Sequence, residues 1–383
     1  MPIQVKGKQY LKLEVGNLRF EVSKSNLEDY LSKVFSQPVQ LESLKKIGEG
    51  FHNVGFLAKL TINGDSRKIV LRIVRGDTGW GHDYLGDRAS VLLLQHELLN
   101  SAPKGKSPKS IDVACLMRDG SLFSLKDGIE FINLMELVEE EEFPSYSNDL
   151  FRIVKDERIS EKDLRRCRII ADYLADLHST KKQNEILYKR HIRDLIGHGE
   201  MLMGVIDTYP DPDKLEFISR KELTEIEVKA VLWRNKIKHL SHRLSRIHGD
   251  IHPFGNIRFK EDDSILVMDF SREEFGEPAD DVSGLSINYL FFSIWHYGEF
   301  REPFKQLFNE FITRYLNKTG DSEIFKILPL FYAFRGLVVA HPLYYPDLED
   351  NRRRMILNFI FNVLEQEEFE IDNIEEYLQA DKN

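Results

Sequence analysis

The chain has 383 residues, of which 42% are hydrophobic, and its 53 Lys+Arg against 63 Asp+Glu give a formal net charge of −10. This ordinary globular composition excludes a wholly disordered chain, and the acidic balance argues against a nucleic-acid partner. The two cysteines, Cys115 and Cys167, are too few and too far apart for a disulfide framework or a cysteine-rich zinc site, and they favour a reducing compartment.

The N-terminus has no apolar core of the signal-peptide kind, and the most apolar stretch, 285–295, is too short to cross a bilayer. That stretch predicts a buried helix. We therefore expect a cytoplasmic protein with no membrane partner.

The first part of the chain reads as strands interrupted by one or two helices. Apolar residues at helical spacing predict a helix over 24–35, with Ser23 or Ser25 as its N-cap. Alternating apolar residues in 56–62, an Asn-Gly-Asp turn and a returning run at 69–74 predict a β-hairpin with a glycine-rich entrance.

A helix is expected over about 83–100, followed by a second hairpin around the turn at 118–120. An apolar run, 131–138, then meets four glutamates, 139–142. Beyond this point helical patterns dominate, with apolar stripes in the segments 164–178, 221–244, 303–317 and 352–365. The pattern predicts an α+β protein in which a small, β-rich N-terminal part precedes a larger, mainly helical one.

The strongest chemical signal lies in the helical half. HGDIHPFGN occupies 248–256, and DFS follows a short apolar strand at 269–271. Asp250, Asn256 and Asp269 thus occur in order as an acid, a carboxamide and a second acid. Such a set can place one carboxylate beside a hydroxyl nucleophile and offer oxygen ligands to Mg²⁺, which is what phosphoryl transfer requires.

These two pieces, followed by GEPADDVS at 276–283, resemble the aminoglycoside phosphotransferase / choline kinase-type family, whose fold is protein-kinase-like. The resemblance implies a bilobal chain, with a nucleotide-binding lobe over 1–137 and a catalytic and acceptor-binding lobe over 138–383. The roles that it implies are Asp250 as catalytic base, Asn256 and Asp269 as Mg²⁺ ligands, and His248 and Asp281 as supports of the catalytic loop.

One interval departs from the family pattern. Asn256 follows Asp250 by six positions, one more than the usual five, so Phe254 or Gly255 is expected to form a bulge. His178, at the end of a predicted helix, matches a histidine that the family often carries there, and the resemblance implies that it supports the catalytic loop.

The expected nucleotide contacts lie in the first lobe. Gly48, Gly50 and Asn53 belong to the glycine-rich entrance of the first hairpin, where backbone N–H groups can approach phosphates. By position, Arg72 stands where kinases carry a strand lysine, and Asp87 is expected to pair with it. The alternative is that both are ordinary surface charges.

The run 131–138 resembles the hinge that holds the adenine, so the backbone of Glu136, Leu137 and Val138 is expected to contact the base. The glutamates that follow have two interpretations. They either form a solvated loop or attract a cationic acceptor.

The sequence thus predicts an ATP- or GTP-dependent, magnesium-dependent kinase that phosphorylates a hydroxyl of a small, cationic acceptor of the aminoglycoside kind. The alternative is a nucleotide-binding pseudokinase or regulatory protein, suggested by Arg72 and by the extra residue before Asn256. A protein kinase is less favoured, because H-R-D and Ala-Pro-Glu motifs are missing. The acceptor, the nucleotide and the oligomeric state stay open.

Overall fold

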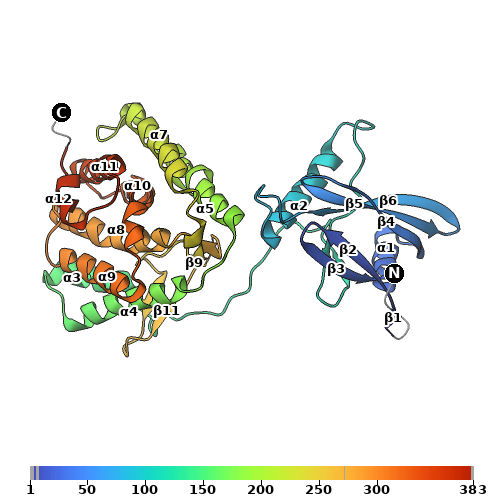
Figure 1. Ribbon diagram of the computed structural model, residues 1–383, viewed down its shortest axis with the longest axis horizontal. Helices are drawn as coiled ribbons and strands as arrows, with labels where there is room; N and C mark the ends of the chain where they lie inside the picture. Colours follow the sequence, from blue (N-terminus) through green and yellow to red (C-terminus); the bar gives the residue numbers. More distant parts are fainter. Residues whose placement is uncertain (1–3, 6–7, 271, 381–383) are drawn as a thin grey trace. The chain divides into compact units, whose positions relative to one another are not determined.

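The computed structural model describes residues 4–5, 8–270 and 272–380. The chain forms two compact units, Met1–Met135 and Glu136–Asn383, drawn from blue to cyan and from cyan to red in Figure 1. The first is β-rich and the second is mainly helical, which confirms the predicted fold class. Among the described residues, no helix combines the length and apolar character that a bilayer crossing needs.

The first unit contains two antiparallel three-stranded sheets, with strand orders β1-β2-β3 and β4-β5-β6, and a small β7-β8 hairpin. Its elements are β1 Gln4–Val5, β2 Lys8–Val15, β3 Leu18–Ser23, α1 Lys24–Phe35, β4 Val39–Glu49, β5 Asn53–Ile62, β6 Asp65–Val74, α2 Leu85–Ser101, β7 Ala114–Leu116 and β8 Leu122–Ser124. The predicted helix at 24–35 and both hairpins are confirmed.

Local chemistry explains these elements. The hydroxyl of Ser23 accepts the N–H of Asn26 and so caps α1. Asn63 and Gly64 both adopt positive φ, 49° and 90°, which the tight β5-β6 turn requires. The core forms where Leu27 and Leu31 of α1 meet the alternating buried residues of the sheet strands.

Two features of this unit could not be read from the apolar pattern. Helix α2 contains several leucines, yet none of its residues is buried within the described structure. The apolar run 131–138 forms no strand or helix, and its side chains from 131 to 137 are exposed, with Leu134 at 93% and Leu137 at 79%.

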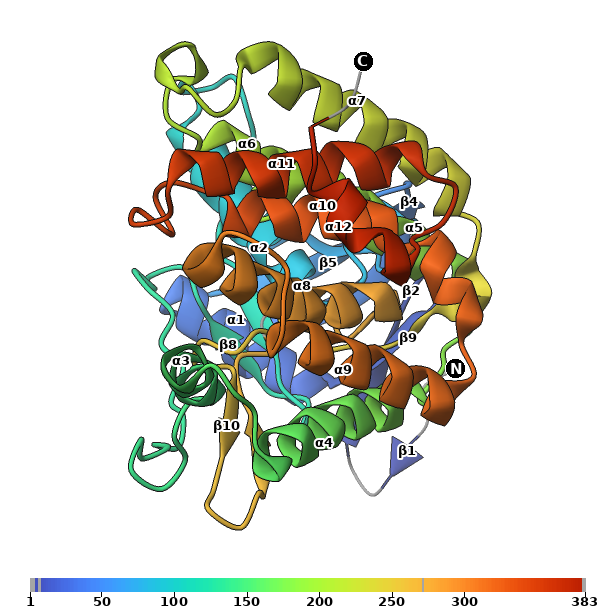
Figure 2. The ribbon, with the colours of Figure 1, turned by 90° about the vertical axis from the view of Figure 1, so that its left-hand side faces the viewer.

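In the second unit, helices α4, α9, α8, α10 and α11 follow one another as packed neighbours (Figure 2). The helices are α3 Tyr146–Asp156, α4 Glu161–His178, α5 Glu185–Gly197, α6 Leu202–Asp207, α7 Arg220–Ile237, α8 Pro278–Tyr297, α9 Phe304–Thr319, α10 Leu328–Val339, α11 Asp350–Glu365 and α12 Ile374–Tyr377. Short 3₁₀ helices are η1 Pro212–Lys214, η2 Ser241–Arg243, η3 Ser322–Lys326 and η4 Ile371–Asn373.

Helix α8 is the centre of this unit, because every residue from Pro278 to Ile294 is buried. A helix that is apolar on all sides belongs inside a helical core, so the prediction of a buried helix over 285–295 is confirmed. Pro278 occupies the first turn, where its missing N–H costs nothing.

Two short antiparallel strand pairs frame the motif residues. β9 Ser245–Arg246 pairs with β12 Phe275–Gly276, and β10 Ile257–Phe259 pairs with β11 Ile265–Val267. The loop after β9 contains His248 and Asp250, and the turn after β11 contains Asp269. The pairings therefore bring together loops that are about twenty residues apart in sequence.

Candidate active site

A chain of hydrogen bonds joins the motif residues at the ends of these strands. The side-chain N–H of Asn256 donates to the carbonyl of Asp250 at 2.8 Å, and the backbone N–H of Met268 donates to the carbonyl of Asn256 at 2.9 Å. The ring of His248 donates from Nε2 to the carbonyl of Met268 at 2.7 Å and accepts the N–H of Asp250 at Nδ1. Two of these hydrogen bonds, both to the backbone of Met268, join the two loops beside Asp269, and the other two brace the first loop internally.

The loop that contains Asp250 is held from α8 by Asp281, which is fully buried. Its carboxylate accepts the backbone N–H groups of His248 at 2.7 Å and Gly249 at 2.8 Å, and the Nε2–H of His178 at 3.0 Å. Burial opposes ionisation, but the His178 hydrogen bond and the neighbouring histidines outweigh it and lower the pKa of Asp281. The sequence predicted support by Asp281 and His178; in the structure Asp281 contacts this loop, and His178 contacts Asp281.

The extra residue before Asn256 is absorbed by a turn at Gly255. Its φ of +91° is readily available only to glycine, and its N–H donates to Oγ of Ser145 at 3.0 Å. Asn256 is consequently buried and reaches the Asp250 carbonyl despite the longer interval. Its amide N–H faces Asp250, so its carbonyl oxygen, the atom that a magnesium ion prefers, points the other way.

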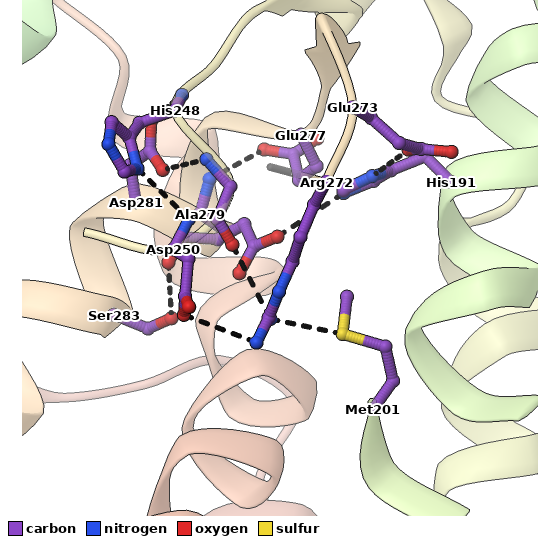
Figure 3. A network of polar contacts seen from close by, with 12 residues as sticks. His191, Met201, His248, Asp250, Arg272, Glu273, Glu277, Ala279, Asp281 and Ser283 are labelled. Carbon is purple, nitrogen blue, oxygen red and sulfur yellow. Dashed lines mark hydrogen bonds and ion pairs between the residues drawn. The ribbon is translucent and has the colours of Figure 1, made fainter. Parts of the chain in front are cut away.

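Asp250 itself is partly exposed and lies between two guanidinium groups, those of Arg335 and Arg272. Figure 3 shows the contact with Arg272. Its Oδ1 is 2.7 Å from Nη1 of Arg335 and 3.2 Å from Nη2 of Arg272. Burial disfavours the charged form, but Arg335 and then Arg272 outweigh it and lower the pKa of Asp250. The carboxylate is therefore ionised at neutral pH.

Behind Asp250, a buried row of charges continues into the helical core. Nη2 of Arg335 donates to Asp280 at 2.6 Å, and the other oxygen of Asp280 is 3.9 Å from Nε2 of His191. Nδ1 of His191 is 2.7 Å from Glu273. Burial lowers the proton affinity of His191, but Glu273 and Asp280 outweigh it and raise its pKa. Burial raises the pKa of Asp280.

Sequence reasoning did not single out Arg272, Arg335, Asp280, His191 or Glu273. A signal for Arg335 exists, because it is the one charged residue of a twelve-residue apolar helix, LPLFYAFRGLVV. A charged side chain within a buried helix requires oppositely charged or hydrogen-bonding partners, and only the tertiary structure shows which residues these are.

The expected phosphate loop lies at the β4-β5 turn of the first unit. The N–H of Gly50 donates to the carbonyl of Asn53 at 2.9 Å, and a side chain added at Gly48 would meet nothing within 4 Å. Arg75, which sequence reasoning missed, forms an ion pair with Glu49 at 3.1 Å beside this turn.

Arg72 is exposed on β6 opposite Gly55. One carboxylate oxygen of Asp87 accepts the N–H of Tyr84 at 2.8 Å at the start of α2, so the structure gives this acid a helix-capping contact. The pairing of Arg72 with Asp87 stays a prediction.

Glu136, Leu137 and Val138 lie at the start of the second unit, in the segment without regular structure. Among the glutamates that follow, Glu140 forms an ion pair with Arg258 and Glu142 with Lys260, both on or next to β10. These pairs neutralise part of the acidic run and favour the interpretation as a solvated loop over an attraction for a cationic acceptor.

No protein-family model matches the chain, and no curated protein matches it. Among solved structures, it is similar to a glucosamine kinase at 14% identity over 86% of this chain and 95% of the other, with a TM-score of 0.36. It is also similar to a Plasmodium vivax ethanolamine kinase (14%, 88% and 80%, TM-score 0.32) and to a type I macrolide 2′-phosphotransferase (14%, 87% and 94%, TM-score 0.27).

Two of these proteins are named as kinases and the third as a phosphotransferase. The identities and TM-scores are low. The geometry of the site, and not this likeness, therefore carries the functional conclusion.

Proposed function

We propose that this protein is a kinase that transfers the γ-phosphoryl group of ATP or GTP to a hydroxyl of a small molecule. The observation that carries the proposal is the hydrogen-bond chain from Asp250 through Asn256 and Met268 to His248. It sets an ionised carboxylate, a carboxamide and the exposed acid Asp269 at adjoining loop ends. Phosphoryl transfer needs little more from a protein than this positioning.

In this proposal, Asp250 accepts the proton of the acceptor hydroxyl as the oxygen attacks phosphorus. Its lowered pKa keeps it ionised, and it gains the proton only as the hydroxyl becomes acidic in the transition state. The loop around it is rigid, because Asp281 and His248 fix its backbone. A rigid loop holds the base at one distance from the acceptor.

The residues present fit a magnesium ion. The free face of the Asn256 amide presents an oxygen, and the Asp269 carboxylate is exposed at a residue with a φ of +66°, a conformation that non-glycine residues rarely adopt. Amide and carboxylate oxygens are the ligands that Mg²⁺ accepts together with phosphate oxygens. When bound, the ion would neutralise the charge of the transferred phosphoryl group.

The nucleotide is proposed to contact Gly48, Gly50, Asn53 and Arg72 of the first unit, with Asp87 positioning Arg72. Its base is proposed to meet the backbone of Glu136, Leu137 and Val138. Two observations support this proposal for the nucleotide. The β4-β5 turn is open, because a side chain added at Gly48 would meet no atom within 4 Å, and these residues occupy the matching places in the family pattern.

The test is phosphoryl transfer from labelled ATP and GTP, with magnesium, to a panel of amino sugars, amino alcohols, aminoglycosides and water. We expect Asp250→Asn to lower kcat by about 10²–10⁴-fold. Asp269→Ala should abolish magnesium-dependent turnover while the fold stays intact. A matched control is Asp262→Ala, an exposed carboxylate in the β10-β11 turn, which should leave kcat unchanged.

Two outcomes would contradict this proposal. Turnover at the wild-type rate in Asp250→Asn would show that Asp250 is not the catalytic base. Magnesium-dependent nucleotide binding without transfer to any acceptor would favour the pseudokinase. A thermal shift detects that binding, because a ligand at about 100 times its Kd adds roughly 2.7 kcal/mol to the stability of the folded state.

A further inference from the structure

Arg335 stands out among the charged residues of the second unit, because it lies in the core and yet contacts the loop that contains Asp250. It is 5% exposed and lies on α10, between buried apolar neighbours. Its guanidinium donates to Oδ1 of Asp250 at 2.7 Å, to the carbonyl of Gly249 at 2.9 Å and to Asp280 at 2.6 Å. A planar guanidinium fixes the directions of all three bonds at once.

These bonds complete the immobilisation of the loop. The N–H of Gly249 is held by Asp281 on α8, and its carbonyl is held by Arg335 on α10. The two peptide units that flank the Cα of Gly249 are therefore each anchored to a helix of the core. The adjoining Asp250 side chain retains only its own torsions, and the contact with Arg335 fixes those.

The contact distinguishes the two oxygens of Asp250. Arg335 and Arg272 both approach Oδ1, at 2.7 and 3.2 Å. Among the described residues, neither guanidinium donates a hydrogen bond to Oδ2, which leaves that oxygen as the one to meet a hydroxyl. An oxygen shared by two cations is also a poor proton acceptor, whereas the opposite oxygen keeps its lone pairs.

Asp280 holds Arg335 in place. A buried guanidinium requires compensation, and Asp280, itself fully buried on α8, supplies it at 2.6 Å. Since Asp250 and Asp280 both accept from Arg335, the cation is centred between them. Phe334 adds a ring face 4.9 Å from the Arg335 guanidinium.

We propose that Arg335 is the positioning residue of the catalytic base: anchored by Asp280, it holds Oδ1 of Asp250 so that Oδ2 faces the acceptor hydroxyl. This inference rests on the proposed kinase function and adds to it a residue from a different helix, 85 positions along the chain. Arg335 itself contacts neither substrate nor metal in this scheme. Its effect reaches the reaction only through Asp250.

The test compares Arg335→Ala, Arg335→Lys and Asp280→Asn with the wild-type protein in the labelled-ATP assay, using the panel acceptor or water that gives the highest rate. We expect Arg335→Ala to lower kcat by about 10²-fold or more while the KM for the nucleotide stays nearly constant, because the nucleotide is not bound by Arg335. Millimolar guanidinium should restore part of the rate. Arg335→Lys should fall between wild type and Arg335→Ala, since one ammonium cannot make all three bonds.

Arg353→Ala is the matched control. Arg353 is a buried arginine of the neighbouring helix α11, and its guanidinium donates to the carbonyls of Ala340 and Tyr345 and to no residue of the catalytic loop. This variant should lose thermal stability without a loss of kcat per folded molecule, and guanidinium should not raise its rate.

The inference fails if the wild-type protein turns over and folded Arg335→Ala retains its kcat, and the kinase proposal then survives. It also fails if Arg335→Ala loses rate only in proportion to its folded fraction and gains nothing from guanidinium. If Arg335→Ala does not fold, Asp280→Asn and Arg335→Lys carry the same kcat test. Absence of turnover in the wild-type protein overturns the kinase proposal and this role together.

Discussion

Replacing Gly284 with alanine offers a sharp test of how α8 supports the catalytic loop. Gly284 is buried in α8, and an added Cβ would lie 2.7 Å from the carbonyl oxygen of Ile251, 3.3 Å from its Cγ2 and 3.5 Å from Cζ of Arg335. Since Cβ atoms essentially never approach a neighbour below 3.0 Å, the Ile251 carbonyl or the helix must move by about 0.3 Å. Ile251 directly follows the proposed base.

The stability effect is a difference of two terms. Alanine is favoured over glycine within a helix by about 1 kcal/mol, whereas overpacking a rigid core costs about 1–3 kcal/mol. The net loss is therefore about 0–2 kcal/mol, and the protein should remain folded. Turnover is more sensitive, because a 1 Å displacement of a reacting group can cost about 10²-fold in rate. A shift of a few tenths of an ångström should thus lower kcat by roughly 3- to 10-fold.

The assay is kcat for phosphoryl transfer, with the melting temperature measured on the same preparations. Gly197→Ala is the control. Gly197 is the last residue of α5, and a Cβ added there would meet no atom within 4 Å. This variant should leave both stability and kcat unchanged. Equal kcat in wild type and Gly284→Ala, or an equal fall in both variants, would refute the reasoning.

Three further predictions follow from single residues. Asp281→Asn replaces one acceptor oxygen with an amide NH₂ group that faces a backbone N–H. It should lower the free energy of unfolding by about 2–4 kcal/mol and also lower kcat. An unchanged melting temperature would contradict the proposal that Asp281 braces the loop. Burial lowers the pKa of His341 to about 4, below the value of about 6.5 in an unfolded chain, so between these pH values the unfolded state binds more protons. Stability should therefore fall with pH from about 6.5 towards 4, by up to about 1.4 kcal/mol per unit, and His341→Phe should flatten this slope in denaturant titrations at pH 7, 6 and 5; parallel slopes would exclude His341 as the source. Asn256→Ala should raise the magnesium concentration needed for half-maximal turnover, and an unchanged magnesium dependence would mean that the bulge at Gly255 has removed this residue from the metal.

Sequence alone determined the features that depend on neighbouring residues. The cap at Ser23, the turn at Asn63 and the continuous apolar stretch within α8 are all local features of the sequence, and the structure contains each of them. The ordered acids Asp250 and Asp269 also indicated the chemistry, because phosphoryl transfer requires oxygen ligands in a restricted arrangement.

Long-range placement was not accessible in the same way. The pairing of Asp87 with Arg72 stays a prediction, and the contact that the structure gives Asp87 is local: one of its carboxylate oxygens accepts a backbone N–H three residues away, at a helix start that offers unsatisfied donors. The acidic run at 139–142 left two interpretations open, a solvated loop or an attraction for a cationic acceptor. Its ion pairs with Arg258 and Lys260 depend on a strand more than a hundred positions away.

The site shows the same division. The sequence determined which residue types stand at 250, 256 and 269, because a motif is a local pattern of chemistry. Only the tertiary structure decided that Arg335 meets Asp250 and Asp280, since that contact depends on the packing of α8 against α10 around the close approach at Gly284. A charged residue within an apolar helical sequence indicates that its side chain has polar partners, and the packing of the helices decides which residues those partners are.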